Sequence, residues 1–259
     1  MVFNKIKTII FNCIKLLFRL FIHLIYYLSG FFPRSENIWV FGSGGGKRFG
    51  DNPKWFFYYC NWRKNNLDFT GSRFIWISRD KEVVQHIINM NYEAFYLYSI
   101  KGIYYCLRAK VYVFDNNPVD ISYVLSRKAI KVNLWHGSPL KKIIWDALDN
   151  TLGKNRSYLK KDSSSLLKLF YRFLHPLYFY KIDLLTASSQ YVKKCFCSAF
   201  YVAKDNVCIT GYPRNDVFFD LEYIRNSLEN EIQYKYILKL KEVNRYKKII
   251  IYMPTFRDT

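Results

Sequence analysis

Residues 129–142 carry the sequence AIKVNLWHGSPLKK, which joins an apolar strand pattern to a short polar turn. The apolar part predicts a buried strand. Gly137 lets the backbone approach closely after that strand, and Pro139 fixes the turn. A lone histidine is more often structural than catalytic, but His136 falls at a strand end with Lys141 close by. Because ligands bind at such strand ends in open α/β sheets, the run predicts a site for a phosphate-bearing substrate.

Outward from this run, short strand patterns alternate with helix patterns. The predicted strands are 38–41, 73–78, 94–98, 111–114, 129–134, 184–187 and 207–209. Helices are predicted from Asp51 or Asn52 onward, at 81–90, through 104–107 and at 190–200. This alternation predicts a parallel, Rossmann-like α/β sheet. A surface loop is predicted at 147–163, further helices at 166–180 and 221–246, and a last strand at 249–252.

Size and composition set broad limits. The 259 residues can hold one large or two small domains, and 51% hydrophobic with 20% aromatic residues excludes a disordered protein. The net charge of +20 has two explanations: a surface that meets phosphates, or the Lys, Asn, Ile, Phe and Tyr content of an AT-rich coding sequence. The charge alone therefore selects no partner. The six cysteines lack zinc spacing, which indicates reduced thiols in a cytosolic compartment.

The first 32 residues are dominated by Ile, Leu, Phe and Tyr, and polar residues recur every three or four positions. On a helix this spacing gives one narrow polar stripe. Charges interrupt the segment too often for a clean membrane span, and no small-residue cleavage site follows it. We expect an amphipathic helix in the membrane interface, with its cations toward lipid headgroups. A transmembrane signal anchor and a buried or partner-binding helix are the alternatives.

The loop Gly44-Gly45-Gly46-Lys47 invites comparison with phosphate-binding loops. It is not a Walker A sequence, because Arg48 stands where a Ser or Thr should bind magnesium. A mobile glycine loop near the substrate and a plain strand-to-helix connection are both open. The sequence shows no serine-nucleophile elbow and no acidic metal cluster, and we expect no paired carboxylates at a common strand end.

Arg214 and Asp216 lie in a glycine- and proline-containing turn after a predicted strand. Arg214 offers a planar fork for a phosphate or carboxylate, and Asp216 can orient that arginine or cap the next helix. A purely structural Arg–Asp pair is the alternative. Thr255 and Arg257 form a similar polar cluster at another strand end. Ser188 is expected first to cap a helix and second to contact phosphate.

Five blocks together resemble the signature motifs of the CDP-glycerol glycerophosphotransferases, the primases and polymerases of teichoic acid synthesis in Gram-positive bacteria. In chain order they are Asn52-Pro53-Lys54, residues 134–142, residues 186–189, residues 211–216 and residues 252–257. Each block alone is weak evidence for the family, but five blocks in the right order argue against a chance resemblance.

The resemblance implies a GT-B architecture, in which two Rossmann-like domains face a cleft. On that basis we divide the chain into a membrane-associating helix (1–32), an acceptor-side domain (38–220) and the start of an incomplete donor-side domain (221–259). Family members continue into a second domain that carries a further histidine and most of the CDP-glycerol pocket. We therefore expect the chain to need that domain for activity.

The resemblance also implies transfer of glycerol phosphate from CDP-glycerol to a lipid-linked acceptor, with release of CMP, at the cytoplasmic membrane face. His136 corresponds to the family's candidate base. The predicted substrate-binding residues are Lys141, Ser188, Arg214, Asp216, Thr255 and Arg257. We predict no cofactor, metal or nucleic-acid partner. Two alternatives stay open: a transferase for CDP-ribitol or a nucleotide sugar, and an inactive protein that binds anionic membrane surfaces.

Overall fold

The computed structural model describes residues 2–66, 69–151, 180–219 and 222–228. Residues 166–179 of the helix predicted at 166–180, the predicted strand at 249–252, and Thr255 with Arg257 lie outside the described residues.

A single sheet of parallel strands organises the described part of the chain, in the order β3-β2-β1-β4-β5-β6-β7. The strands are β1 (Ser35–Phe41), β2 (Arg73–Ser78), β3 (Ala94–Tyr96), β4 (Ala109–Phe114), β5 (Ile130–Asn133), β6 (Leu184–Ala187) and β7 (Val207–Ile209). The predicted Rossmann-like α/β sheet is confirmed. Because all the strands are parallel, their carboxyl ends meet along one edge of the sheet.

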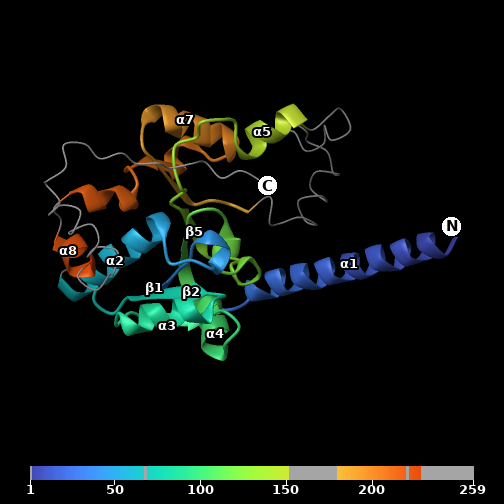
Figure 1. Ribbon diagram of the computed structural model, residues 1–259, viewed down its shortest axis with the longest axis horizontal. Coiled ribbons are helices and arrows are strands. Elements are labelled where there is room, and N and C mark those ends of the chain that lie inside the picture. Colours follow the sequence, from blue (N-terminus) through green and yellow to red (C-terminus); the bar gives the residue numbers. More distant parts are fainter. Residues whose placement is uncertain (1, 67–68, 152–179, 220–221, 229–259) are drawn as a thin grey trace, which may run out of the picture.

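The helices are α1 (Val2–Ser29), α2 (Asp51–Asn66), α3 (Lys81–Asn89), α4 (Ile100–Arg108), α5 (Ile144–Thr151), α7 (Gln190–Ala199) and α8 (Glu222–Leu228). The prediction of a loop from residue 147 is wrong as far as residue 151, because α5 occupies that stretch. Packing explains the helix: Trp145 stacks on Tyr201 with ring centroids 5.7 Å apart, and Ser198 donates to Asp146 at 2.6 Å. Figure 1 accordingly shows α5 and α7 side by side.

The core lies on both faces of the sheet. Central strands are apolar at consecutive positions, as in β2, where residues 74–77 are at most 1% exposed. Successive side chains point to opposite faces, so Phe41 packs with residues of α2 and α3 while Val40 packs with residues of α4. Because packed side chains cover both faces of the sheet, a ligand can reach the sheet at the edge formed by the carboxyl ends of the strands.

Helix α1 extends away from the sheet, and only its last turns pack on the body of the protein (Figure 1). Tyr26 stacks on Tyr123 with ring centroids 4.7 Å apart, and Arg127 lies over Tyr27. Large apolar side chains of the preceding turns are exposed: Phe11, Ile14, Leu16, Leu17, Phe18, Leu20, Phe21 and Leu24. Among the helices that the structure describes, none is both long and apolar enough to span a bilayer.

Helix α8, the described start of the segment assigned to the second domain, packs on α2. The ring of Tyr223 lies 5.3 Å from that of Tyr59, and both Tyr223 and Ile224 are buried. This helix therefore shares the core of the sheet domain.

Candidate active site

The chain reverses direction within the sheet between β1 and β4. It runs outward from β1 through β2 to β3, then returns to β4 and continues through β5 to β7 on the other side. Ligands of doubly wound proteins bind at such a switch point, outside the carboxyl ends of the strands. Here β1 leads into the glycine loop, β4 into Asp115, and β5 into the segment that carries His136.

His136 is exposed at this edge, and its Nδ1 lies 3.1 Å from the backbone carbonyl oxygen of Asp115. A carbonyl oxygen only accepts hydrogen bonds, so Nδ1 carries the hydrogen. In the neutral ring, Nε2 then has the free lone pair. The ring also stacks on Trp135, with centroids 4.1 Å apart. This geometry presents Nε2 as the atom that can accept a proton.

The backbone before His136 is held in an unusual conformation. Trp135 has a φ of 49°, which is rare for a bulky residue. Its N–H donates to Asn133 at 2.8 Å, its carbonyl accepts from Asn52 at 2.6 Å, and the carbonyl of Leu134 accepts from Thr186 at 2.8 Å. Such local strain persists only when the surroundings determine it firmly. These contacts fix the turn that sets the imidazole against the end of β4.

Arg214 reaches the same place from the segment after β7. Its Nη1 lies 3.0 and 3.3 Å from the two carboxylate oxygens of Asp51, and its backbone N–H donates to Asn52 at 3.1 Å. Gly137 follows His136 with a φ of 154°, and a Cβ at that position would lie 3.5 Å from Arg214 Nη2. The guanidinium group therefore stands beside the backbone of the residue next to His136.

Asp216 does not orient Arg214, and that prediction is wrong. Its Oδ2 accepts a hydrogen bond from the Tyr223 hydroxyl at 2.6 Å. Residues 213–218 form a 3₁₀ helix, in which positions two apart point in different directions. Asp51 is the partner of Arg214 instead. Its place at the start of α2, in chain positions far from 214, gave no sequence signal for that pairing.

Ser188 lies next to the segment after His136, because its Oγ is 3.0 Å from that of Ser138. The cap of α7 is Ser189, whose side chain accepts from the backbone N–H of Val192. Ser188 therefore does not cap α7, contrary to the first of its two expected roles.

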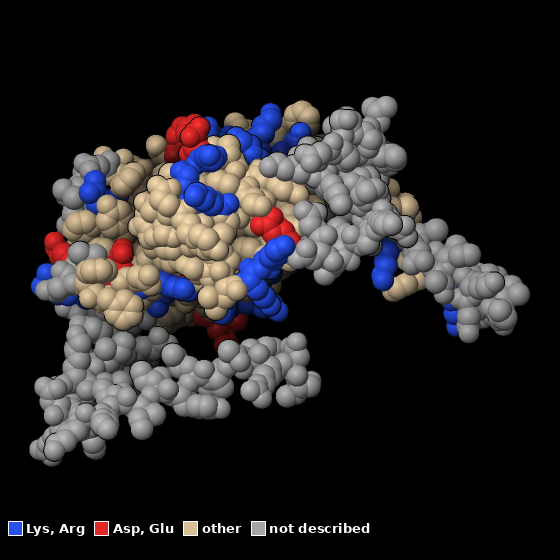
Figure 2. Space-filling model, turned by 90° about the horizontal axis from the view of Figure 1, so that it is seen from above, with Lys and Arg blue, Asp and Glu red and all other residues tan. Residues whose placement is uncertain are grey.

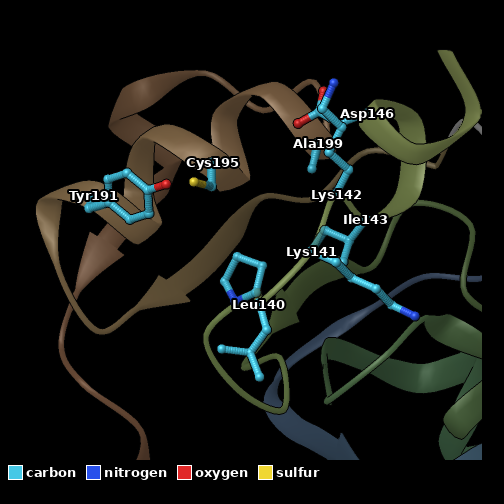
Figure 3. A pocket seen from close by; sticks show the side chains of 9 residues that line it. Leu140, Lys141, Lys142, Ile143, Asp146, Tyr191, Cys195 and Ala199 are labelled. Carbon is cyan, nitrogen blue, oxygen red and sulfur yellow. The ribbon is translucent and has the colours of Figure 1, made fainter. Parts of the chain in front are cut away.

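Lys141 lies in the next part of this loop, beside a cavity of about 250 Å³ between the loop and α7. Figure 3 shows its side chain pointing away from α7, whereas Tyr191 and Cys195 face the cavity from that helix. The lining residues are Pro139, Leu140, Lys141, Lys142, Ile143, Asp146, Tyr191, Cys195 and Ala199. Of the predicted site residues that the structure describes, Lys141 and Asp216 do not contact the others.

Asp115 and Asp120 form a carboxylate pair after β4, so the expectation that no such pair exists is wrong. They are only 3% and 1% exposed. Burial, and next the nearby charge of Asp120, raise the pKa of Asp115 to about 7. Two aspartates five positions apart, directly after an apolar strand, were the sequence signal for this pair.

Backbone N–H groups surround these carboxylates. Asp120 accepts from Gly45 at 2.7 Å, from Asn116 at 2.9 Å and from Asn117 at 3.2 Å. Ser43 donates to Asp115 at 2.8 Å. The donors of the glycine loop are thus engaged with the protein itself, which favours the interpretation of a strand-to-helix connection. No group of three or more metal-ligating side chains gathers within the part of the chain that the structure describes.

Comparison with known families decides the family. Residues 24–259 match the model described as CDP-Glycerol:Poly(glycerophosphate) glycerophosphotransferase. The chain belongs to this family. The matched range contains all five blocks that carry the resemblance.

Curated relatives agree. The chain is 30% identical over 244 residues to a teichoic acid poly(glycerol phosphate) polymerase of Bacillus spizizenii, covering 91% of the chain and 54% of the relative. It is 30% identical over 266 residues to a teichoic acid glycerol-phosphate transferase of Staphylococcus aureus, covering 100% and 58%. The chain thus spans somewhat more than half the length of these relatives.

Solved structures share the fold. The wall teichoic acid polymerase TagF aligns with a TM-score of 0.52 at 20% identity, over 94% of this chain and 52% of that one. A TagF variant soaked with CDPG aligns with a TM-score of 0.56 at 23% identity, over 87% and 49%. The likeness confirms the α/β fold of GT-B type that the sequence predicts.

Proposed function

We propose that the chain carries the acceptor side of an enzyme that transfers glycerol phosphate from CDP-glycerol to a lipid-linked acceptor, releasing CMP. The product would be teichoic acid or a related cell-surface polymer. The family assignment supports the reaction class, and one observation supports the mechanism: the Nδ1 of His136 is held by the Asp115 carbonyl. That contact leaves Nε2 free to act as a base.

In this reaction the acceptor hydroxyl gives its proton to Nε2 of His136. The hydroxyl oxygen forms a bond to the β-phosphorus of CDP-glycerol. The bond from that phosphorus to the bridging oxygen breaks, and CMP leaves with the electron pair. Phosphoryl transfer of this kind depends mainly on positioning and charge stabilisation.

Among the described residues, Arg214 is placed to stabilise the negative charge of the phosphoryl group during transfer. Its guanidinium stands beside Gly137, next to His136, and the arginine fork suits a phosphate better than a lysine does. Arg257 and Thr255 lie outside the described residues, so their proposed roles rest on the sequence pattern and the family resemblance.

The test is CMP release from CDP-glycerol with a membrane acceptor, for the chain alone and with a donor-side domain of a relative added. We expect His136→Ala to lower turnover by about 10²- to 10⁴-fold. The matched control is His86→Ala, which removes an imidazole from α3, away from this edge. Unchanged turnover in His136→Ala would refute the base. Vesicle binding without turnover, even with the added domain, would favour the inactive membrane-surface protein.

CDP-ribitol is the second candidate donor. The chain is 24% identical over 240 residues to a teichoic acid poly(ribitol-phosphate) polymerase of Bacillus spizizenii. We expect donor selection to lie in the second domain, so comparing CMP release from the two CDP-polyols decides between them.

We further propose that the protein attaches peripherally to the cytoplasmic membrane face through α1. The exposed apolar side chains of this helix, together with Lys15 and Arg19, support binding at a lipid–water interface.

Over the face seen in Figure 2, basic side chains stand in several separate groups with acidic ones between them. Fractionation tests the role of α1: a variant lacking residues 1–32 should leave the membrane fraction, and retention as strong as that of the full chain would refute it.

A further inference from the structure

Asp51 begins α2 in a conformation that side-chain-bearing residues rarely adopt, with a φ of 55°. Its carboxylate contacts Arg214 Nη1 through both oxygens, at 3.0 and 3.3 Å. One of these oxygens also accepts from the backbone N–H of Asn52 at 2.8 Å. These contacts hold an anionic group in one position on the arginine.

The ion pair is accessible. The side chains of Arg214 and Asp51 are 38% and 23% exposed. Ion pairs of this exposure contribute little to the stability of the fold. A phosphate offers more acceptor oxygens than a carboxylate and pairs well with the planar fork of arginine. An incoming phosphate can therefore compete with Asp51 for the guanidinium.

We propose that Asp51 is a positioning residue whose carboxylate lies where a substrate phosphate binds Arg214. The carboxylate keeps the guanidinium beside Gly137 and His136. A substrate phosphate then displaces this carboxylate from the guanidinium. The identity of the substrate rests on the proposed function. The donor's pyrophosphate and a terminal phosphate of the acceptor share this chemistry.

The experiment is a calorimetric titration of the full chain and of its Asp51→Asn variant at low salt. Inorganic pyrophosphate represents the donor, and glycerol 3-phosphate represents the acceptor end. Asparagine keeps the shape of the side chain and tolerates positive φ, so the substitution removes the negative charge and one acceptor oxygen. Removing the competing anion should tighten binding of at least one probe, by up to about fivefold. The probe that gains identifies the source of the phosphate.

Three variants make the result specific. Asp80→Asn removes the same charge from the N-cap of α3, where Asp80 accepts from Glu82, and should give no comparable gain. Arg214→Gln in the Asp51→Asn background should erase the gain. Asp51→Gly repeats the test with a residue that adopts this φ freely.

A purely structural ion pair predicts no gain in binding. Unchanged or weaker binding of both probes in Asp51→Asn and Asp51→Gly, or no binding of either probe by any form of the chain, would overturn the proposal. The titration needs no turnover. A failure of the proposed transferase reaction would therefore appear in the CMP assay and leave this result readable.

Discussion

The side-chain amide of Asn52 donates a hydrogen bond of 2.6 Å to the carbonyl oxygen of Trp135. Asn52 is fully buried, donates also to the carbonyl of Leu134 at 3.3 Å, and accepts from the backbone N–H of Arg214. One side chain at the start of α2 thus joins the segment after β5 to the segment after β7. The relative position of His136 and Arg214 depends on it.

We therefore expect Asn52→Asp to destabilise the protein and to disturb the site. The substitution replaces an N–H donor by a carboxylate oxygen that faces two carbonyl groups. Leaving buried polar groups unpaired costs about 1–3 kcal/mol, and the cost rises when a charge is involved. Urea denaturation should show this loss of unfolding free energy.

Asn61→Asp is the matched control on the same helix. Asn61 is half-buried and donates to the carbonyl of Phe57, four residues earlier in α2. The change there should have a clearly smaller effect. Equal stability losses at the two positions would contradict the role of Asn52 as a link.

The second prediction concerns the pH dependence of stability. In the folded protein, burial and the charge of Asp120 raise the pKa of Asp115 to about 7, above its value in the unfolded chain. The folded state then binds more protons between these two values. The contribution of Asp115 to stability is fully present below the pKa that this carboxyl has in the unfolded chain. That contribution is lost as the pH rises through about 7.

Asp115→Asn should remove this dependence. The stability of the unsubstituted chain should fall with rising pH from about 4 to 7, at up to about 1.4 kcal/mol per pH unit for one proton. The variant should lack that part of the slope and should gain stability relative to the wild type above pH 7. Denaturation at a series of pH values measures it, with Asp80→Asn as the control, and an unaltered slope in Asp115→Asn would be inconsistent with the shift.

The sheet could be predicted from the sequence because the strands are short apolar runs between helix patterns. The position of His136 followed from the same reasoning, since the residues after β5 are a strand end in any parallel sheet. The partners of the site residues could not be predicted. Asp51 and Arg214 are 163 positions apart, and local spacing carries no information on such pairs.

Short sequence separation did not predict side-chain pairing either. Asp216 stands two positions after Arg214, and an extended turn would have allowed them to pair. The 3₁₀ helix at 213–218 separates them instead. The approach of Asp115 to Asp120 depends on the capping of the short helix at 118–120, where Asn117 and Asp120 cap each other, and an apolar strand pattern does not predict that cap.

The third prediction uses the cysteines as a readout of the fold. Cys60 and Cys106 are at most 1% exposed, and burial raises the pKa of the Cys106 thiol to about 12 and that of Cys60 further. Cys195, Cys197 and Cys208 are half-buried. Because the thiolate is the reactive form, iodoacetamide should modify these three first.

Mass spectrometry of peptides from the natively labelled chain gives the order of modification. Labelling in urea should remove the difference among these five described thiols, since unfolding exposes them all. Early modification of Cys60 or Cys106 in the native protein would mean that the core on that face of the sheet is open.

The last prediction concerns Gly137. Its φ of 154° favours glycine, and the nearest group to an added Cβ is Arg214 Nη2 at 3.5 Å. That distance is ordinary contact, so Gly137→Ala should fit sterically but strain the backbone, at a cost of about 1–3 kcal/mol. The chain can relieve the strain by shifting the turn that carries His136. Turnover should therefore fall by more than the loss of folded protein explains, provided the proposed reaction holds. Gly50→Ala is the control, because nothing lies within 4 Å of a Cβ there and its φ is outside the left-handed region. That variant should match or slightly exceed the wild type in stability. If Gly137→Ala were as stable as Gly50→Ala, the backbone at position 137 would not need glycine, and the fixed approach of Arg214 to the turn beside His136 would lose its explanation.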